Sequence, residues 1–283
     1  MKKLFSIVLA ALMVAALFAG CGSSTAETKA PETTTAPATE AAAPAETEAP
    51  AETEAAAAFT TIEAGKLIMS TNAAFPPYEM VADDGSFEGI DVEIAGAVAA
   101  KLGLELVVDD MDFDAALLAV QQGKSDIVMA GVTVNEDRKM VMNFSDTYSK
   151  GVQVVIVKEG SDVTLDNLGD QMIGTQRGTT GYIYTSGDYG EDHVTAYDNG
   201  ASAVQALANG QVDCVVIDSA PAEAFVEANP GLTILDTEYT SEDYAIGMSK
   251  DNTALLDAVN AALAELTADG TIPAIVEKYI PTK

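Results

Sequence analysis

The strongest constraint on the fold is a regular alternation of short apolar segments with helical segments, which runs from about residue 59 to the C-terminus. In the helical segments the apolar residues recur three or four positions apart, whereas the short segments are continuously apolar. Strands that alternate with single helices form parallel sheets with helices on both faces, so the pattern predicts an α/β fold. The predicted strands lie at 67–70, 104–108, 126–130, 172–175, 213–217 and 244–248.

Short polar residues and glycines indicate where the predicted helices begin and end. Asp91, Asp114 and Ser219 each precede a helical segment, where a side-chain oxygen can accept a hydrogen bond from a free backbone N–H. Gly103 and Gly123 follow the first two segments and predict their ends. The strand and helix pattern repeats once, which suggests two α/β units. Two final helices, near 255–268 and 272–279, fit neither unit, so we expect the chain to return to the first.

The N-terminal residues 1–20 are typical of an export signal. Two lysines precede an apolar run over 4–18, which is shorter than the roughly 20 residues of a transmembrane helix. Ala19 and Gly20 are small residues directly before Cys21. The segment resembles the lipobox of bacterial lipoproteins, which implies that Cys21 is acylated and becomes the mature N-terminus. The alternative is an ordinary signal peptide that happens to end at a cysteine.

Residues 21–58 are almost entirely Ala, Thr, Glu, Pro and Ser, with too few large apolar side chains to build a core. We expect a disordered, self-repelling tether between the lipid anchor and the folded part. The whole chain has a formal net charge of −30, and loss of the two lysines in the signal segment makes it −32. Such a charge argues against nucleic-acid partners and against anionic membrane surfaces, which leaves the lipid as the membrane contact.

No residue pattern in the chain predicts catalysis, a metal or a cofactor. His193 is the single histidine and has no nucleophile paired with it, and neither a metal-ligand cluster nor a phosphate-binding glycine loop is present. Cys214 lies in an apolar run, so we expect a small core residue rather than a nucleophile. With Cys21 acylated, Cys214 has no partner for an internal disulfide.

Several short motifs occur in one characteristic order. Together they resemble the amino-acid-binding proteins of ATP-binding-cassette importers, the bacterial extracellular solute-binding protein family 3, along nearly the whole folded part. They are Phe75 to Glu79, Phe87 to Asp91, Asp126 to Thr133, Arg138, Phe144 to Tyr148, Gly178 to Thr180, Val212 to Asp218, Asp269 to Thr271, and Lys278 with Tyr279.

This resemblance implies a two-lobed periplasmic-binding-protein-like α/β fold. Each lobe would be a mostly parallel sheet flanked by helices, with a two-strand hinge near 148–153 and 244–247. Lobe 1 would comprise 59–149 and 245–283, and lobe 2 would comprise 150–244. The ligand would lie in the cleft between the lobes, at the carboxyl ends of sheet strands, and the lobes would close on it by a hinge motion.

The resemblance also implies which groups bind the two charged ends of an amino acid. Arg138 matches the arginine that binds the carboxylate, a role that suits its planar fork of donors. Asp218 would face the ammonium group, while Phe75 and Phe113 would form apolar walls. The rest of the implied ligand set is Asn72, Ala130, Gly131, Thr133, Gly178, Thr179 and Thr180. The alternatives are a surface charge for Arg138, a helix cap for Asp218, core packing for both Phe residues and a plain loop at 178–180.

The identity of the amino acid depends on two positions. Asn72 occupies a place where several relatives, including binders of basic amino acids, carry an acidic residue. Its neutrality favours a polar, uncharged ligand such as glutamine. Arg177 precedes the Gly178 loop, and an acidic ligand or cystine would fit if Arg177 pointed into the cleft.

The resulting hypothesis is a non-enzymatic, monomeric binding protein that lies outside the cytoplasm of a bacterium and is anchored to the cell membrane by its lipid. It would pass a free amino acid to the permease subunits of an importer. A dehydratase-type enzyme is one alternative, because a few dehydratases share this fold. A ligand-sensing module is the other, because two-lobed binding domains also serve as receptor ectodomains.

Overall fold

One mixed β-sheet runs through the part of the chain that this computed structural model describes, residues 59–281. Its strands follow the order β5-β1-β6-β12-β7-β10-β8-β9, and β11 (Leu232–Ile234) pairs with β7 beside this path. The predicted signal segment, Cys21 and the predicted tether lie outside the described residues. Within the described range, no helix is both long enough and apolar enough to cross a membrane.

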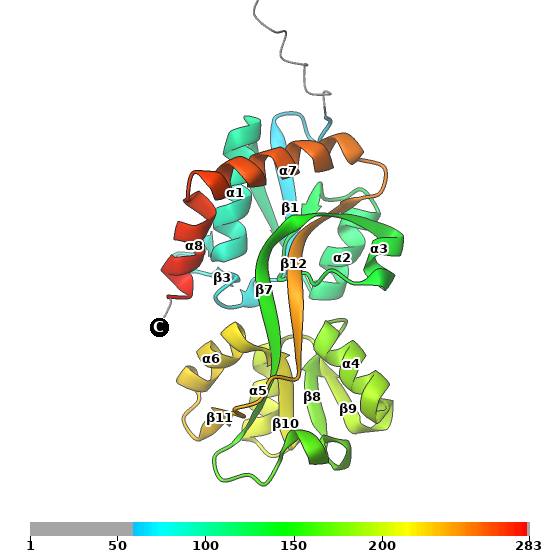
Figure 1. Cartoon of the computed structure of the whole chain (residues 1–283), viewed down its shortest axis with the longest axis vertical. Coiled ribbons are helices and arrows are strands. Elements are labelled where there is room, and N and C mark those ends of the chain that lie inside the picture. Colours follow the sequence, from blue (N-terminus) through cyan, green and yellow to red (C-terminus); the bar gives the residue numbers. More distant parts are fainter. Residues whose placement is uncertain (1–58, 282–283) are drawn as a thin grey trace, which may run out of the picture. The chain divides into compact units, whose positions relative to one another are not determined.

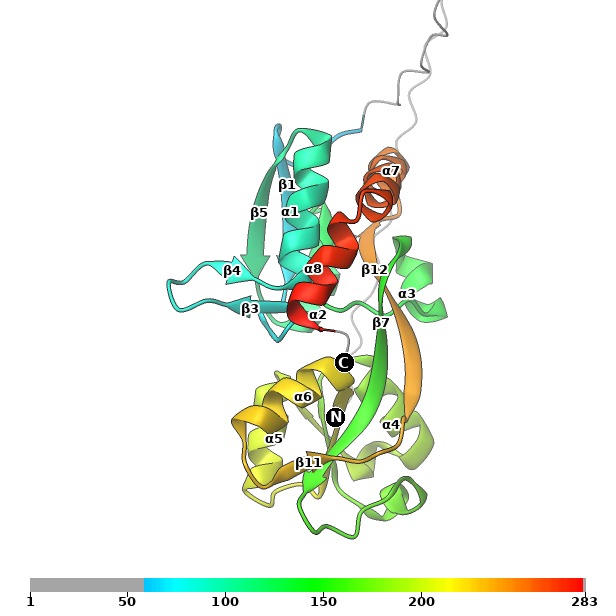
Figure 2. The ribbon, with the colours of Figure 1, turned by 60° about the vertical axis from the view of Figure 1, so that its left-hand side comes forward.

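The first half of the sheet is parallel. Strand β1 (Lys66–Thr71) pairs in parallel with β5 (Glu105–Asp110) and with β6 (Ile127–Val128). Helices α1 (Ile90–Leu102) and α2 (Phe113–Gln121) connect these strands, as the periodicity predicted (Figure 1). A separate three-stranded sheet, β2 (Ala74–Phe75), β3 (Glu79–Val81) and β4 (Phe87–Glu88), projects to one side (Figure 2).

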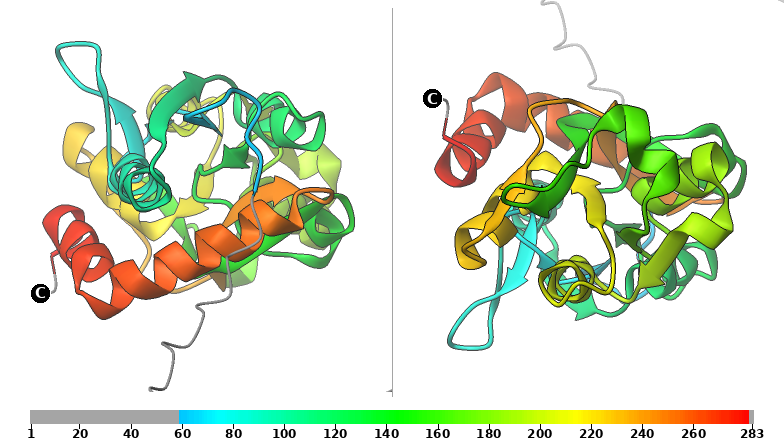
Figure 3. Two further views of the ribbon diagram at one scale, coloured as in Figure 1. Left: turned by 90° about the horizontal axis from the view of Figure 1, so that it is seen from above. Right: turned by 90° about the horizontal axis from the view of Figure 1, so that it is seen from below.

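The other end of the sheet repeats this design. Strands β8 (Ile173–Gln176), β9 (Val194–Tyr197) and β10 (Cys214–Asp218) pair in parallel, with β8 in the middle. The short helical turns η1 (Leu165–Asp170) and η2 (Glu191–His193) flank this group. Its helices are α4 (Thr180–Tyr189), α5 (Gly200–Ala208) and α6 (Ser219–Ala228), which surround the strands when the molecule is seen from below (Figure 3, right).

Two long strands join the halves. β7 (Met142–Lys158) follows the short helix α3 (Glu136–Val141) and pairs antiparallel with β12 (Thr240–Ser249). β12 also pairs with β6 in the first half, and β7 pairs with β10 in the second. The strand ladder between β7 and β12 changes register between Tyr244 and Ala245, and again before Gly247. These are the strands predicted as the hinge, whereas the proposed lobe boundaries stay a prediction.

The last two helices pack against the first half, which is where the sequence predicted the chain would return. α7 (Thr253–Ala268) and α8 (Thr271–Tyr279) both contact α1 (Figure 1). Lys278 donates to Glu93 of α1, and Tyr279 donates to the same carboxylate at 2.6 Å. These polar contacts and the buried Ile272 tie the end of the described chain to its beginning.

Helix starts differ from the prediction by one or two residues. The N-cap positions are held by Gly89, Asp112 and Asp218, and none of the three makes a side-chain capping bond. Asp91 lies inside the first turn of α1, where its Oδ2 accepts instead from the N–H of Gly131 at 2.9 Å. The predicted caps at Asp91, Asp114 and Ser219 were therefore wrong, because sequence spacing does not reveal a distant donor.

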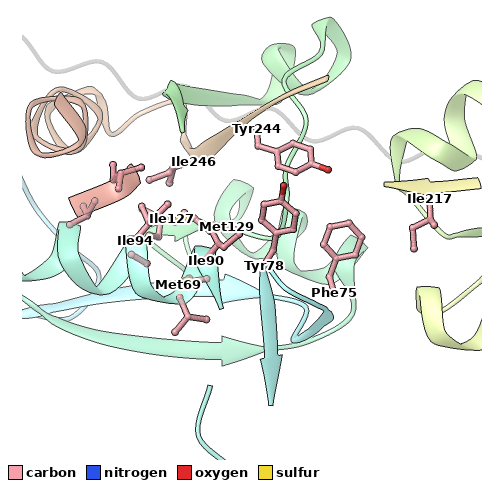
Figure 4. Packing of buried hydrophobic residues seen from close by; sticks show 14 of the residues in the cluster. Met69, Phe75, Tyr78, Ile90, Ile94, Ile127, Met129, Ile217, Tyr244 and Ile246 are labelled. Carbon is pink, nitrogen blue, oxygen red and sulfur yellow. The ribbon is translucent and has the colours of Figure 1, made fainter. Parts of the chain in front are cut away.

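A cluster of buried apolar side chains holds the first half together. Met69, Ile94, Ile127 and Ile246 come from four different elements and are fully buried (Figure 4). At the edge of this cluster the ring of Tyr244 meets the ring of Tyr78 edge to face, with centroids 5.2 Å apart. In the other half Cys214 is buried, as predicted, and burial raises the pKa of its thiol to about 12, which makes it unreactive.

The hinge strand β7 carries a glycine at a point of very close packing. A Cβ at Gly151 would collide with the hydroxyl of Tyr244 and lie 2.6 Å from Oδ1 of Asp218. Tyr244 donates a hydrogen bond to that same Oδ1. The absence of a side chain at Gly151 therefore leaves room for the Tyr244 and Asp218 pair.

We expect Gly151→Ala to lower the free energy of unfolding by about 1–3 kcal/mol, because an added methyl group in a packed site forces displacement. Chemical denaturation of the purified protein measures this. Gly187→Ala in α4 is the control, since a Cβ there has no atom within 4 Å. Equal stability of the two variants would contradict the steric argument.

Candidate ligand-binding site

A cavity of about 310 Å³ lies where the two halves of the sheet face each other. Arg138 and Asp218 both line it, so the shared cavity that the sequence predicted exists. Its other lining residues come from the small strands β2 and β3, from the ends of β1 and β8, from the segment after β6, and from the starts of helices α2 and α4. They are Asn72, Phe75, Glu79, Phe113, Ala130, Gly131, Thr133, Gln176, Thr179 and Thr180.

Parallel strands explain why these side chains meet. Asn72 follows β1, Ala130 follows β6, and Gln176 and Asp218 end β8 and β10. In an open α/β sheet the residues just beyond the carboxyl ends of the strands form a crevice that accepts ligands.

Arg138 is held by carbonyl groups rather than by a carboxylate. The side chain of Asn135 caps α3 and accepts from the N–H of Arg138 at 2.8 Å. The guanidinium donates to the carbonyls of Thr133 (2.8 Å) and Gly178 (3.2 Å). Its carbon lies 5.4 Å from the ring centre of Phe113. Arg138 forms no ion pair with any residue from 59 to 281, so several of its five donors remain for an anionic ligand.

Asp218 ends β10 with its carboxylate held by the two long strands. Oδ1 accepts from the Tyr244 hydroxyl and Oδ2 accepts from Nε2 of Gln153 at 2.8 Å. Burial raises the pKa of Asp218 to about 7, and the charge of Glu242 adds to this effect. A nearby ammonium group would favour the ionised carboxylate and so lower that pKa.

Phe75 and Phe113 form the apolar walls of the cavity, and Gly131 packs against the ring of Phe75. Phe75 and Phe113 are 7% and 6% exposed, so both are buried as well as facing the cavity. Gly131 has φ of +55°, and a Cβ there would lie 2.9 Å from Cε1 of Phe75. Only glycine satisfies both conditions at low cost, and the small residue leaves the backbone open to the cavity.

The loop from Gln176 to Thr180 belongs to the second half and makes hydrogen bonds to the first half. Nε2 of Gln176 donates to Oδ1 of Asn72 at 2.9 Å. Thr179 caps α4 by accepting from the N–H of Tyr182. Gly178 is not among the lining residues, although its carbonyl accepts from Arg138 and its α-carbon packs tightly against Asp114. The loop is thus the start of a helix, which the sequence analysis did not predict.

Arg177 points away from this cavity. Its side chain is 56% exposed, lies 3.6 Å from Oδ1 of Asp198 and donates to the carbonyl of Ala196. The condition for an acidic ligand or cystine, that Arg177 line the cleft, is therefore not met in this structure.

Two lining residues were missed by the sequence analysis. Gln176 ends a strand that was predicted one residue too early in the chain, at 172–175. Glu79 belongs to the quoted motif Phe75 to Glu79, but its chemistry was not used. It is fully buried, and its carboxyl group lies beside that of Asp91, with which it interacts. Burial, reinforced by the charge of Asp91, raises the pKa of Glu79 well above its usual range.

Comparison with known proteins decides the family. Residues 67–282 match the bacterial extracellular solute-binding proteins, family 3. The chain belongs to this family. A probable histidine-binding protein of Neisseria gonorrhoeae is 32% identical over 231 residues, which is 79% of this chain and 86% of that protein. Family 3 members are solute-binding proteins rather than enzymes, so this chain is the amino-acid-binding component of an ATP-binding-cassette importer.

Solved structures agree with this assignment. An ancestral arginine-binding protein bound to glutamine superposes with a TM-score of 0.73 at 38% identity, covering 77% of this chain and 99% of that one. Another, bound to arginine, gives 0.73 at 39% identity, covering 76% and 98%. The predicted two-lobed α/β fold of this family 3 protein is therefore confirmed. Within residues 59–281, no group of three or more His, Cys, Asp or Glu side chains is placed to hold a metal ion.

The buried carboxyl groups predict an unusual dependence of stability on pH. The folded-state pKa is about 7 for Asp218 and about 6 for Asp91, and that of Glu79 is also raised. The folded protein then binds protons more tightly than the unfolded chain, so stability rises as pH falls and is lost as pH rises through these values. We expect the ligand-free protein to melt at a higher temperature at about pH 5 than at about pH 8.

Thermal melts at several pH values measure this dependence. Asp218→Asn should reduce the pH-dependent change in the free energy of unfolding by on the order of a few kcal/mol across this range, because it removes one group with a raised pKa. The melting temperature of the variant should therefore depend less on pH. Asp83→Asn removes one exposed charge and serves as the control. A wild-type melting temperature that falls from pH 8 to pH 5 would be incompatible with neutral buried carboxyl groups.

Proposed function

We propose that the cavity binds a free amino acid as its zwitterion, with the carboxylate on Arg138 and the ammonium group on Asp218. The observation that carries this proposal is that a guanidinium without an ion pair among the described residues and a buried carboxylate share one small cavity. The Thr133 carbonyl accepts from Arg138 and helps to hold its guanidinium, and the N–H groups at the start of α4, beside Thr179 and Thr180, would donate to the ligand carboxylate. The carbonyls of Ala130 and Gly131 would accept from the ammonium group.

Further inferences concern the setting of this activity. We propose a monomer that is exported, acylated at Cys21 and attached to the bacterial membrane by its lipid. It would deliver the ligand to permease subunits after lobes 59–149 with 245–283 and 150–244 close around it. The sequence patterns described above support these proposals.

The ligand side chain would end in N–H donors. Its neighbours would be the flat faces of Phe75 and Phe113 and the polar groups of Asn72, Gln176 and Glu79. Glutamine, the expectation from Asn72, fits two amide neighbours and a protonated Glu79, because an amide both donates and accepts. A family relative bound to glutamine adds support to this choice.

Arginine is the second candidate, and Glu79 favours it. A buried carboxyl group that lines the cavity matches the paired donors of a guanidinium, and that cation would lower the pKa of Glu79 and ionise it. Stacking of a guanidinium between two phenylalanine rings would add a cation–π contribution. The family relative whose structure contains bound arginine adds support to this candidate.

A thermal-shift screen across the free amino acids separates the candidates, because a ligand that binds only the folded state raises the melting temperature. We expect a shift from glutamine, from arginine or from both, and none from aspartate or glutamate. A shift from an acidic amino acid alone would refute the proposed side-chain environment.

Removing the guanidinium of Arg138 should abolish most of the affinity. We expect Arg138→Ala to weaken binding of L-glutamine or L-arginine by about 100-fold or more, because two charge-assisted hydrogen bonds are lost. Isothermal titration calorimetry measures the change. Arg177→Ala removes the exposed neighbouring arginine and should bind like the wild type. Unchanged binding by Arg138→Ala would remove the basis of the proposed function.

The charge of Glu79 distinguishes the two candidate ligands. We expect Glu79→Gln to weaken arginine binding by about tenfold or more and to leave glutamine binding within about threefold, since a neutral side chain keeps an acceptor but loses its charge. The control is Glu88→Gln, an exposed position on the same small sheet. Equal loss for both amino acids would show that Glu79 acts through packing alone.

A further inference from the structure

A second buried carboxylate lies beside the cavity without lining it. Glu242 is on the long strand β12, opposite Gly151 of β7, and is 6% exposed. Neither the sequence analysis nor the set of lining residues includes it. A charged side chain so deeply buried requires partners, because the surrounding protein stabilises charge poorly.

Glu242 connects groups from both ends of the proposed zwitterion site. Its Oε2 accepts from the hydroxyl of Thr133 at 3.1 Å and from Nε2 of Gln153 at 2.9 Å. The same nitrogen of Gln153 donates to Oδ2 of Asp218 at 2.8 Å. One carboxylate thus ties Thr133, beside Arg138, to Asp218 across the two long strands.

Glu242 is also the charged residue with the largest influence on the pKa values of Arg138 and Asp218. Its charge is the largest single influence that opposes the effect of burial on the pKa of Arg138. It is the charge that adds most to the raised pKa of Asp218. The charged and titratable groups that face Asp218 are Glu79, Arg138, Glu242, Tyr78, Tyr184 and Tyr244.

We propose that Glu242 is a positioning residue for amino-acid binding, which holds Thr133, whose carbonyl accepts from Arg138, and, through Gln153, the Asp218 carboxylate in place for the two ends of the ligand. The proposal rests on the proposed function. Its hydrogen bonds run to Thr133 and to Gln153 of β7, and Gln153 in turn donates to Asp218, so loss of the carboxylate releases both ends of the site together.

Two substitutions separate geometry from charge. Glu242→Ala removes both acceptor oxygens and leaves the Gln153 amide and the Thr133 hydroxyl without this partner. Glu242→Gln has the same shape and keeps one acceptor, but it lacks the charge. Asp243→Asn is the matched control, because Asp243 is the next residue on β12, is exposed and pairs with the exposed Lys150.

Calorimetric titrations with L-arginine and with L-glutamine test the geometric role. For each probe that the wild type binds at about pH 8, we expect Glu242→Ala to weaken binding by about tenfold or more. Glu242→Gln and Asp243→Asn should bind within about threefold of the wild type. Wild-type affinity in Glu242→Ala, or an equal loss in Glu242→Ala and Glu242→Gln, overturns the proposal.

The pH profile provides a readout that packing alone would not change. Wild-type affinity should fall as pH drops through the pKa of Asp218, because a protonated carboxyl no longer attracts an ammonium group. Without the charge of Glu242, Asp218 should ionise more easily, so in Glu242→Gln the fall should move to lower pH by about half a unit or more. An unchanged profile overturns the electrostatic part of the proposal.

A measurement without ligand distinguishes failure of this proposal from failure of the proposed function. Nuclear magnetic resonance can follow the titration of the Asp218 carboxyl carbon in the ligand-free protein. We expect its midpoint to move to lower pH in Glu242→Gln and to stay unchanged in Asp243→Asn. If the wild type binds neither probe, the proposed function fails. If the midpoint does not move, the link from Glu242 to Asp218 fails.

Discussion

The structure depends on holding one guanidinium and several carboxyl groups buried close together. Buried charges are costly unless hydrogen bonds stabilise them, and here the partners are carbonyls for Arg138 and hydroxyl and amide groups for Asp218. These partners come from elements far apart in the chain. The fold therefore has to bring them together before the site has any affinity for a charged ligand.

The two long strands β7 and β12 supply much of this support. Gln153 and Tyr244 lie on them and both donate to Asp218, while Gly151 leaves the space that Tyr244 occupies. The same strands carry the sheet from one half of the described chain to the other. The residues that hold the proposed ligand-binding carboxylate thus lie on the strands that connect the halves. A substitution among them would therefore affect both the proposed site and the connection.

The sequence predicted most of the main parallel strands and the helices α1, α2, α6, α7 and α8 because their periodicity is local. It also predicted ten of the cavity's lining residues through a resemblance of short motifs. It missed α4, whose residues 180–189 include two glycines and several β-branched or aromatic side chains of weak helix propensity. Gln176 with Asn72 and Glu242 with Thr133 meet across more than a hundred residues, and residue type alone does not identify such partners.

The irregular register of β12 has a mechanical consequence. The ladder to β7 is interrupted directly after Tyr244, and a strand twists more easily where paired hydrogen bonds are missing. Twisting of the two strands at this point would displace the hydroxyl of Tyr244, which donates a hydrogen bond to Asp218. If Asp218 binds the ammonium group as proposed, a change in the twist of the two strands would also change the ligand site, and stiffening the strands at that step would alter ligand affinity.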